Sequence, residues 1–73
     1  MPIDWTIIEG HWHQFAGQAR QYWGRLTDNE WEEIAGEKDR LIGVLQQHYG
    51  LTYAEAEYSI ERFVTDHGVL PQW

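Results

Sequence analysis

Cysteine is absent from this chain of 73 residues, so the fold has no disulfide, no thiolate metal site and no thiol nucleophile. Basic residues are scarce as well: five Lys and Arg stand against twelve Asp and Glu, for a formal net charge of -7. This charge argues against nucleic acid and anionic membranes as partners. No apolar run is long enough to span a membrane, and the amino terminus lacks the pattern of a secretory signal. We therefore expect a cytoplasmic protein without a membrane segment.

Aromatic residues, by contrast, are abundant, with five Trp, four Tyr and two Phe. A chain this short buries only about 60% of the surface that its unfolded form exposes, so these rings are expected to supply most of the cohesion. Not every ring can be covered, and an exposed apolar patch favours a partner or self-association site. Trp5 and Trp73, near the two ends, are the candidates for such an interaction surface.

The first half of the chain carries one amphipathic stripe with spacings of three and four residues, which predicts a helix. Asp4 is its candidate N-cap, and Gly24 is expected to end it in a left-handed conformation. The stripe consists of Trp5, Ile8, Trp12, Phe15, Ala19 and Tyr22.

A second helix is predicted to begin at Thr27, which has the capping-box spacing to Glu30. Its apolar pattern continues to Tyr49 and stops at Gly50, with a bend or break at Gly36.

A last helix is predicted from the second capping box, formed by Thr52 and Glu55, and is expected to end at Gly68. The residues expected on its apolar face are Ala56, Ile60, Phe63 and His67. Residues 69–73 are expected to form a short irregular tail.

A shift of 26 residues reveals an internal repeat. The repeat places Ile8-Glu9-Gly10, Gly17, Gln21 and Gly24 on Ile34-Ala35-Gly36, Gly43, Gln47 and Gly50. We interpret residues 1–73 as a single domain with units at about 4–33 and 34–68. The predicted fold is all-α, with four or so short helices in two crossed helical hairpins.

Glycines recur every seven residues in both units, at Gly10, Gly17 and Gly24 and again at Gly36, Gly43 and Gly50. Interior glycine costs roughly 0.5–1 kcal/mol relative to alanine, so these positions call for a physical reason. One interpretation is that they allow close helix approach or a bend. The other is that the helices are deliberately weak and the protein is only conditionally ordered.

Several segments together resemble the CsbD-like family of small bacterial general stress-response proteins. They are Ile8-Glu9-Gly10-His11-Trp12-His13-Gln14-Phe15-Ala16-Gly17, Trp23-Gly24-Arg25-Leu26-Thr27-Asp28, Gly36-Glu37-Lys38-Asp39-Arg40-Leu41-Ile42-Gly43 and Gln46-Gln47-His48-Tyr49-Gly50. The resemblance implies helices arranged as in sterile-alpha-motif-like and helix-hairpin-helix folds, expression under general stress, and no catalytic residues. Relatives often have lysine at five positions that are occupied here by His11, His13, Ala16, Gln18 and Ala19.

No residue pattern indicates catalysis, a cofactor or a metal. His11 and His13 are two apart and point in different directions on a helix, and the carboxylates from Asp28 to Glu37 are explained by a solvated helix start. The leading hypothesis is a non-catalytic module that binds a protein partner or protects proteins in bulk, as a monomer or with weak self-association. The alternative is a nucleic-acid-associated protein that uses its hairpin turns, where Arg25 supplies the nearby positive charge.

Overall fold

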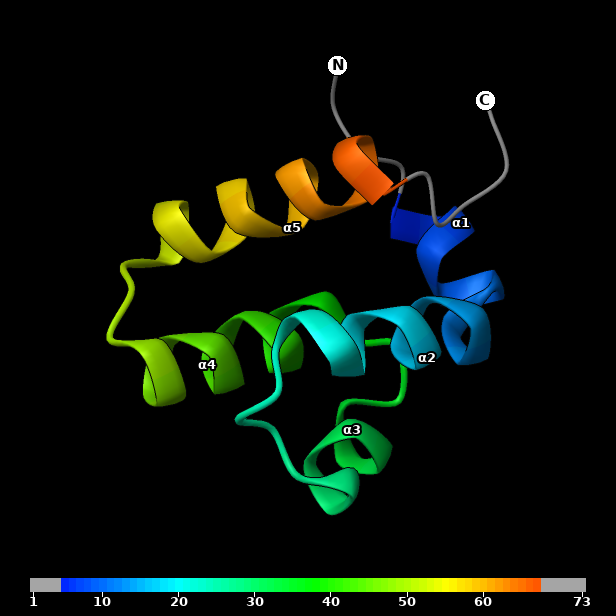
Figure 1. Cartoon of the computed structure of the whole chain (residues 1–73), viewed down its shortest axis with the longest axis horizontal. Helices are drawn as coiled ribbons and strands as arrows, with labels where there is room; N and C mark the ends of the chain where they lie inside the picture. Colours follow the sequence, from blue (N-terminus) through cyan, green and yellow to red (C-terminus); the bar gives the residue numbers. More distant parts are fainter. Residues whose placement is uncertain (1–4, 68–73) are drawn as a thin grey trace.

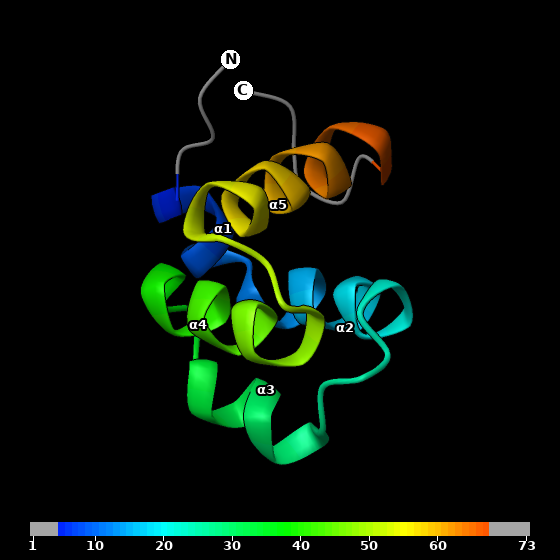
Figure 2. The same ribbon diagram turned by 90° about the vertical axis from the view of Figure 1, so that its left-hand side faces the viewer.

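The computed structural model describes residues 5–67, and this part of the chain is all-helical. It contains five helices: α1 (Trp5–Gly10), α2 (Trp12–Tyr22), α3 (Asp28–Ile34), α4 (Lys38–Tyr49) and α5 (Tyr53–His67). In Figures 1 and 2, α2 and α4 lie side by side, α5 lies across them on one face and α3 on the other, and α1 adjoins one end. The all-α prediction is confirmed. The hairpin arrangement and the repeat stay predictions.

The first predicted helix is in fact two helices, because the chain turns at His11. His11 has φ -118° and ψ 33°, and its side chain makes no capping hydrogen bond. Its backbone N–H donates to the carbonyls of both Ile7 and Ile8, each at 3.1 Å. Gly10, a poor helix former, directly precedes the turn. The uninterrupted helix that the stripe predicted is therefore wrong at this point.

The break predicted at Gly36 is confirmed. Ala35 and Gly36 both have positive φ, 48° and 84°, and the N–H of Glu37 donates to the Ile34 carbonyl at 2.8 Å. A Cβ on Gly36 would meet Cγ of Glu9 at 3.2 Å. Glycine is required here by backbone conformation and by space together.

Both capping boxes are confirmed. The hydroxyl of Thr27 accepts the Glu30 N–H at 3.2 Å, and the Glu30 carboxylate accepts the Thr27 N–H at 2.8 Å. Thr52 and Glu55 make the same two bonds at 3.1 and 2.8 Å.

The predicted helix ends differ in outcome. Gly50 ends α4, as predicted, and the structure shows it in the left-handed conformation. The left-handed ending at Gly24 is wrong: Trp23 caps α2 with ψ 70°, and Gly24 does not have positive φ. Asp4 and Gly68 lie outside the described residues.

An aromatic cluster joins α2 and Trp23, the residue directly after it, to α5. The ring of Trp12 stacks on Phe15 at 5.4 Å, Phe15 meets Phe63 edge-on at 5.6 Å, and Phe63 lies 5.0 Å from Trp23. Phe15, Trp23 and Phe63 are buried, whereas Tyr22 remains 50% exposed. The centre of the amphipathic stripe found in the sequence is thus part of the core, whereas Tyr22, at its end, is not.

The interior glycines are not packing positions. A Cβ added at Gly10, Gly17 or Gly43 would meet nothing within 4 Å. Close helix approach is therefore wrong as the reason for these three glycines. The alternative, a bend, agrees with the turn at Gly36 and with the break directly after Gly10.

Candidate binding groove

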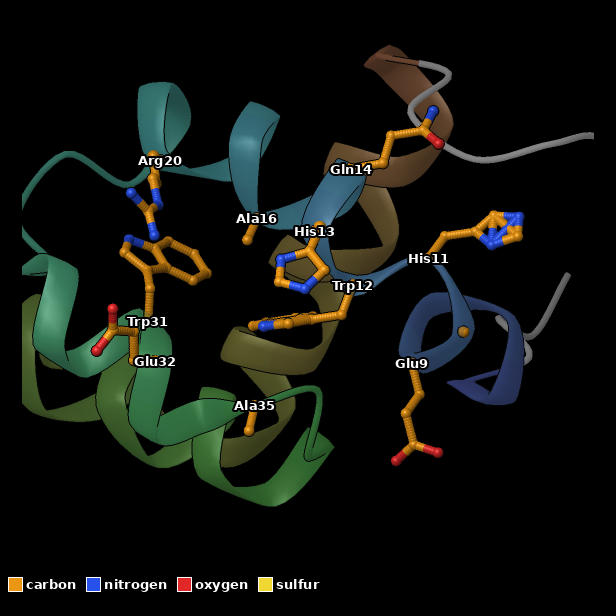
Figure 3. A pocket seen from close by; sticks show the side chains of 11 residues that line it. Glu9, His11, Trp12, His13, Gln14, Ala16, Arg20, Trp31, Glu32 and Ala35 are labelled. Atoms are coloured by element: carbon orange, nitrogen blue, oxygen red, sulfur yellow. The ribbon is translucent and has the colours of Figure 1, made fainter.

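An open groove of about 870 Å³ lies where the end of α1 and the first turns of α2 face α3. Figure 3 shows the side chains that line it. Its position follows from the two breaks in the chain. The turn at His11 separates α1 from α2, and the turn at Ala35 and Gly36 brings the end of α3 against them.

Two tryptophans form the floor of this groove. The rings of Trp12 and Trp31 are 6.0 Å apart and tilted by 46°, and Ala16 and Ala35 also line the groove (Figure 3). Trp31 is only 1% exposed, whereas Trp12 is partly buried and packs against the core. Trp12 is also stacked on Phe15 from behind, so the floor is apolar and held in place.

Ionisable side chains surround the floor, and their charges are unequally compensated. Arg20 is paired with Asp28 at 3.1 Å. Glu9 and Glu32 have neither an ion pair nor a hydrogen bond within the described part of the chain. With histidines counted as neutral, the uncompensated charge at this groove is negative.

The histidines singled out in the sequence both line the groove and are exposed. The ring of His13 lies near that of Trp12, whereas His11 points away from the centre (Figure 3). Among residues 5–67, no group of three or more His, Asp or Glu side chains is arranged to hold a metal ion.

Trp5 is partly buried and packs against the core. Its indole N–H donates to the Gly36 carbonyl at 2.6 Å, and its ring meets Phe15 edge-on at 6.3 Å. Trp5 thereby ties α1 to the turn between α3 and α4. Trp73 lies outside the described residues, and an interaction surface formed by the two tryptophans stays a prediction.

The sequence led us to expect Glu30 to be solvated at the start of its helix, but the structure gives it a side-chain partner. Its carboxylate lies 2.7 Å from Nε2 of His48 on α4. The Thr27 backbone N–H, followed by the His48 side chain, lowers the pKa of Glu30. No local spacing indicates this pair, because the two residues are 18 positions apart.

Arg25, the cation of the turn after α2, is engaged with the end of α4. Its guanidinium donates to the His48 carbonyl at 3.2 Å and lies 5.4 Å from the ring centroid of Tyr49. Its backbone N–H donates to the Tyr49 hydroxyl at 3.3 Å. These contacts fasten the turn between α2 and α3 to α4.

A second, smaller hollow of about 320 Å³ lies between α3 and α4. It is lined by Glu33, Ile34, Arg40, Gly43, Val44 and Gln47. Glu32 and Glu33, adjacent in sequence, thus line different hollows, which makes them a matched pair for experiments.

The fold and the groove define a small all-helical protein with a tryptophan-floored surface depression. A family model described as CsbD-like matches residues 6–57, which is more than half of the chain. The chain belongs to the CsbD-like family, as its sequence motifs predicted.

Curated relatives agree with this assignment. UPF0337 protein ECA0631 of Pectobacterium atrosepticum is 38% identical over 58 residues, which cover 80% of this chain and 84% of the relative. UPF0337 protein YjbJ of Escherichia coli K12 is 39% identical over 51 residues, which cover 70% and 74%. UPF0337 protein NE2439 of Nitrosomonas europaea is 34% identical over 64 residues, which cover 88% and 68%. No solved structure matches the chain significantly. Within residues 5–67, none of the helices combines the length and hydropathy that a membrane crossing requires.

Proposed function

We propose that this chain is a non-catalytic cytoplasmic module of the bacterial stress response that acts by binding another protein. The observation that carries the proposal is the groove between α2 and α3. Its floor is an apolar surface that includes the partly buried Trp12, and its rim carries exposed ionisable side chains. An apolar centre with a polar rim is the usual composition of a protein interface.

The charge distribution favours a protein partner over nucleic acid. The net charge of -7 opposes the counterion release that drives nucleic-acid binding. Arg25, the cation that the alternative hypothesis required at the hairpin turn, already contacts His48 and Tyr49. The groove, rather than the hairpin turns, is therefore the proposed binding surface.

The test compares two variants that add the same side chain to α2. Ala16→Gln places a longer side chain in the groove, and Gly17→Gln places it one residue further on, where the backbone faces open space. Each tagged variant is expressed in stressed native cells, and the recovered proteins are compared with those of the wild type. Circular dichroism establishes that both variants are folded.

We expect a partner that the wild type and Gly17→Gln recover and that Ala16→Gln loses. If both variants recover the same partner in equal amount, the groove is not the binding surface. If the wild type recovers no specific protein, the proposal of a defined partner fails, and bulk protection becomes the better description. Retention of nucleic acid by the wild type that is lost in high salt would favour the alternative function.

A further inference from the structure

We propose that the groove between α2 and α3 receives an extended segment of a partner protein that carries lysine or arginine side chains. The aliphatic stem of a basic residue would lie along Trp12, and its cationic end would meet Glu9 or Glu32. This inference rests on the proposed function and specifies the chemistry of the partner at the same groove.

The compensation of charges around α3 supports a cationic occupant. Three acidic residues on or beside α3 are already paired: Asp28 with Arg20, Glu30 with His48, and Glu37 with Arg40. Glu33 has no such partner among the described residues, but it lines the other hollow. At the groove, by contrast, Glu9 and Glu32 have no ion pair or hydrogen bond with any described residue. A cation that approaches the groove could therefore bind these carboxylates without breaking an existing ion pair.

The placement of the two carboxylates fits a segment that crosses the aromatic floor. Glu32 follows Trp31 directly on α3, and Figure 3 shows Glu9 beyond Trp12 on the other side of the groove. Glu9 and Trp12 are close neighbours, since Cγ of each lies within 4 Å of the position that a Cβ on Gly36 would take. Acidic groups thus stand at both sides of the floor.

The floor itself suits the stem of a long basic side chain. Lysine and arginine cover apolar surface with their methylene groups while their charged ends remain in water. A cation close to an indole face is attracted electrostatically by the π-electrons of the ring. An acidic segment would instead meet Glu9 and Glu32 without compensation, and the guanidinium of Arg20 is already shared with Asp28.

The binding test uses full-length ¹⁵N-labelled protein and short peptides blocked at both ends. One peptide carries two lysines among alanines and glycines. Matched peptides carry norleucine, which keeps most of the stem and removes the charge, or glutamate. Binding at low salt is followed by the indole N–H signals in ¹H–¹⁵N spectra, with the Trp12 signal assigned by comparison with Trp12→Phe.

We expect saturable shifts of the Trp12 signal with the lysine peptide, weaker binding of the norleucine peptide and no binding of the glutamate peptide. Glu9→Gln and Glu32→Gln should each raise the Kd by about 1.5- to fivefold, the range for one exposed ion pair. Glu33→Gln is the matched control, because it removes an adjacent charge that lines the other hollow. This control should leave the Kd unchanged.

Three results would overturn the inference. The first is the absence of saturable shifts at roughly 1 mM lysine peptide, which is the weak end of specific binding. The second is equal affinity for the lysine and norleucine peptides, and the third is equal weakening by Glu33→Gln and Glu32→Gln. If the lysine peptide fails while Ala16→Gln still abolishes partner recovery, the proposed function stands and only the basic chemistry of the partner is wrong.

Discussion

The short helices α1 and α3 each precede a turn and a longer helix, but they are held in very different ways. α3 begins with the Thr27 capping box, buries Trp31 and Ile34, and ends in a left-handed turn. α1 buries Ile8 and ends at an exposed turn without a left-handed residue. Two helices of 6 and 7 residues, each followed by a turn and a longer helix, therefore rest on different interactions.

The difference shows that α1 depends on the turn that follows α3. The indole N–H of Trp5 donates to the Gly36 carbonyl, and the Glu9 side chain lies against Gly36. No comparable hydrogen bond runs from α3 to the turn at His11 among the described residues. A disturbance at Gly36 should consequently loosen α1, whereas one at Gly10 should leave α3 in place.

The largest difference is expected between Gly36→Ala and Gly10→Ala. Gly36→Ala forces a side chain into a left-handed conformation and against Glu9, and should lower the free energy of unfolding by about 1–3 kcal/mol. Gly10→Ala adds a methyl group to open space within α1 and should raise it by about 0.5–1 kcal/mol. Urea unfolding followed by circular dichroism measures both. Equal effects at the two positions would contradict the contrast between the turns.

Trp5→Phe tests the dependence of α1 on Gly36 more directly. This substitution keeps an aromatic ring beside Phe15 and removes the indole N–H, so it should cost about 0.5–1.5 kcal/mol. Hydrogen exchange should accelerate for the amides of α1 and remain unchanged for those of α3. Equal acceleration in the two helices would mean that Trp5 supports the whole core rather than α1.

The helical class and several helix boundaries were predictable because their signals are local. The capping boxes at Thr27 and Thr52 and the helix stop at Gly50 follow from short sequence spacings, and all three are confirmed. The turn at His11 was missed because the apolar stripe continues through it. Periodicity reports which face is buried and does not reveal a change of direction that keeps that face inside.

The groove was less predictable, because it depends on contacts between distant segments. The sequence singled out His11 and His13, which line it, and drew attention to Trp5 and Trp73 as a surface instead. It gave no sign that Trp12 would face Trp31, 19 positions away, since helical spacing describes one element at a time. The pairing of Glu30 with His48 was missed for the same reason.

The glycines within α2 and α4 extend the comparison to the helices that follow α1 and α3. Because a Cβ at Gly17 or Gly43 would meet nothing within 4 Å, alanine at either position should stabilise the protein by about 0.4–1 kcal/mol. Thermal unfolding of Gly17→Ala and Gly43→Ala should show similar increases in Tm. A decrease in Tm at either position would mean that close packing explains that glycine after all. Increases in Tm at both positions would favour the interpretation that the glycines keep these helices weak.

The smallest expected effect is on stability in acid, and it should differ between α3 and α5. Both helices begin with the same kind of capping box. The pKa of Glu30 lies below the ordinary 4.5, first because of the Thr27 N–H and then because of His48. A carboxylate whose pKa is lowered by folding contributes stability above its unfolded pKa, and this contribution disappears as the pH falls through the folded pKa. Glu30→Gln retains an acceptor for Thr27 and removes the charge that faces His48. Its deficit in Tm should therefore be full above about pH 5 and vanish in acid.

Glu55→Gln is the control for that measurement, because Glu55 makes the same two bonds with Thr52 and has no histidine partner. Its deficit above about pH 5 should be smaller than that of Glu30→Gln, because only the interaction with the cap is weakened. Equal deficits for the two variants would assign the whole effect to the capping boxes. A larger deficit for Glu30→Gln would instead identify the contact with His48 as a second support of α3, in addition to its capping box.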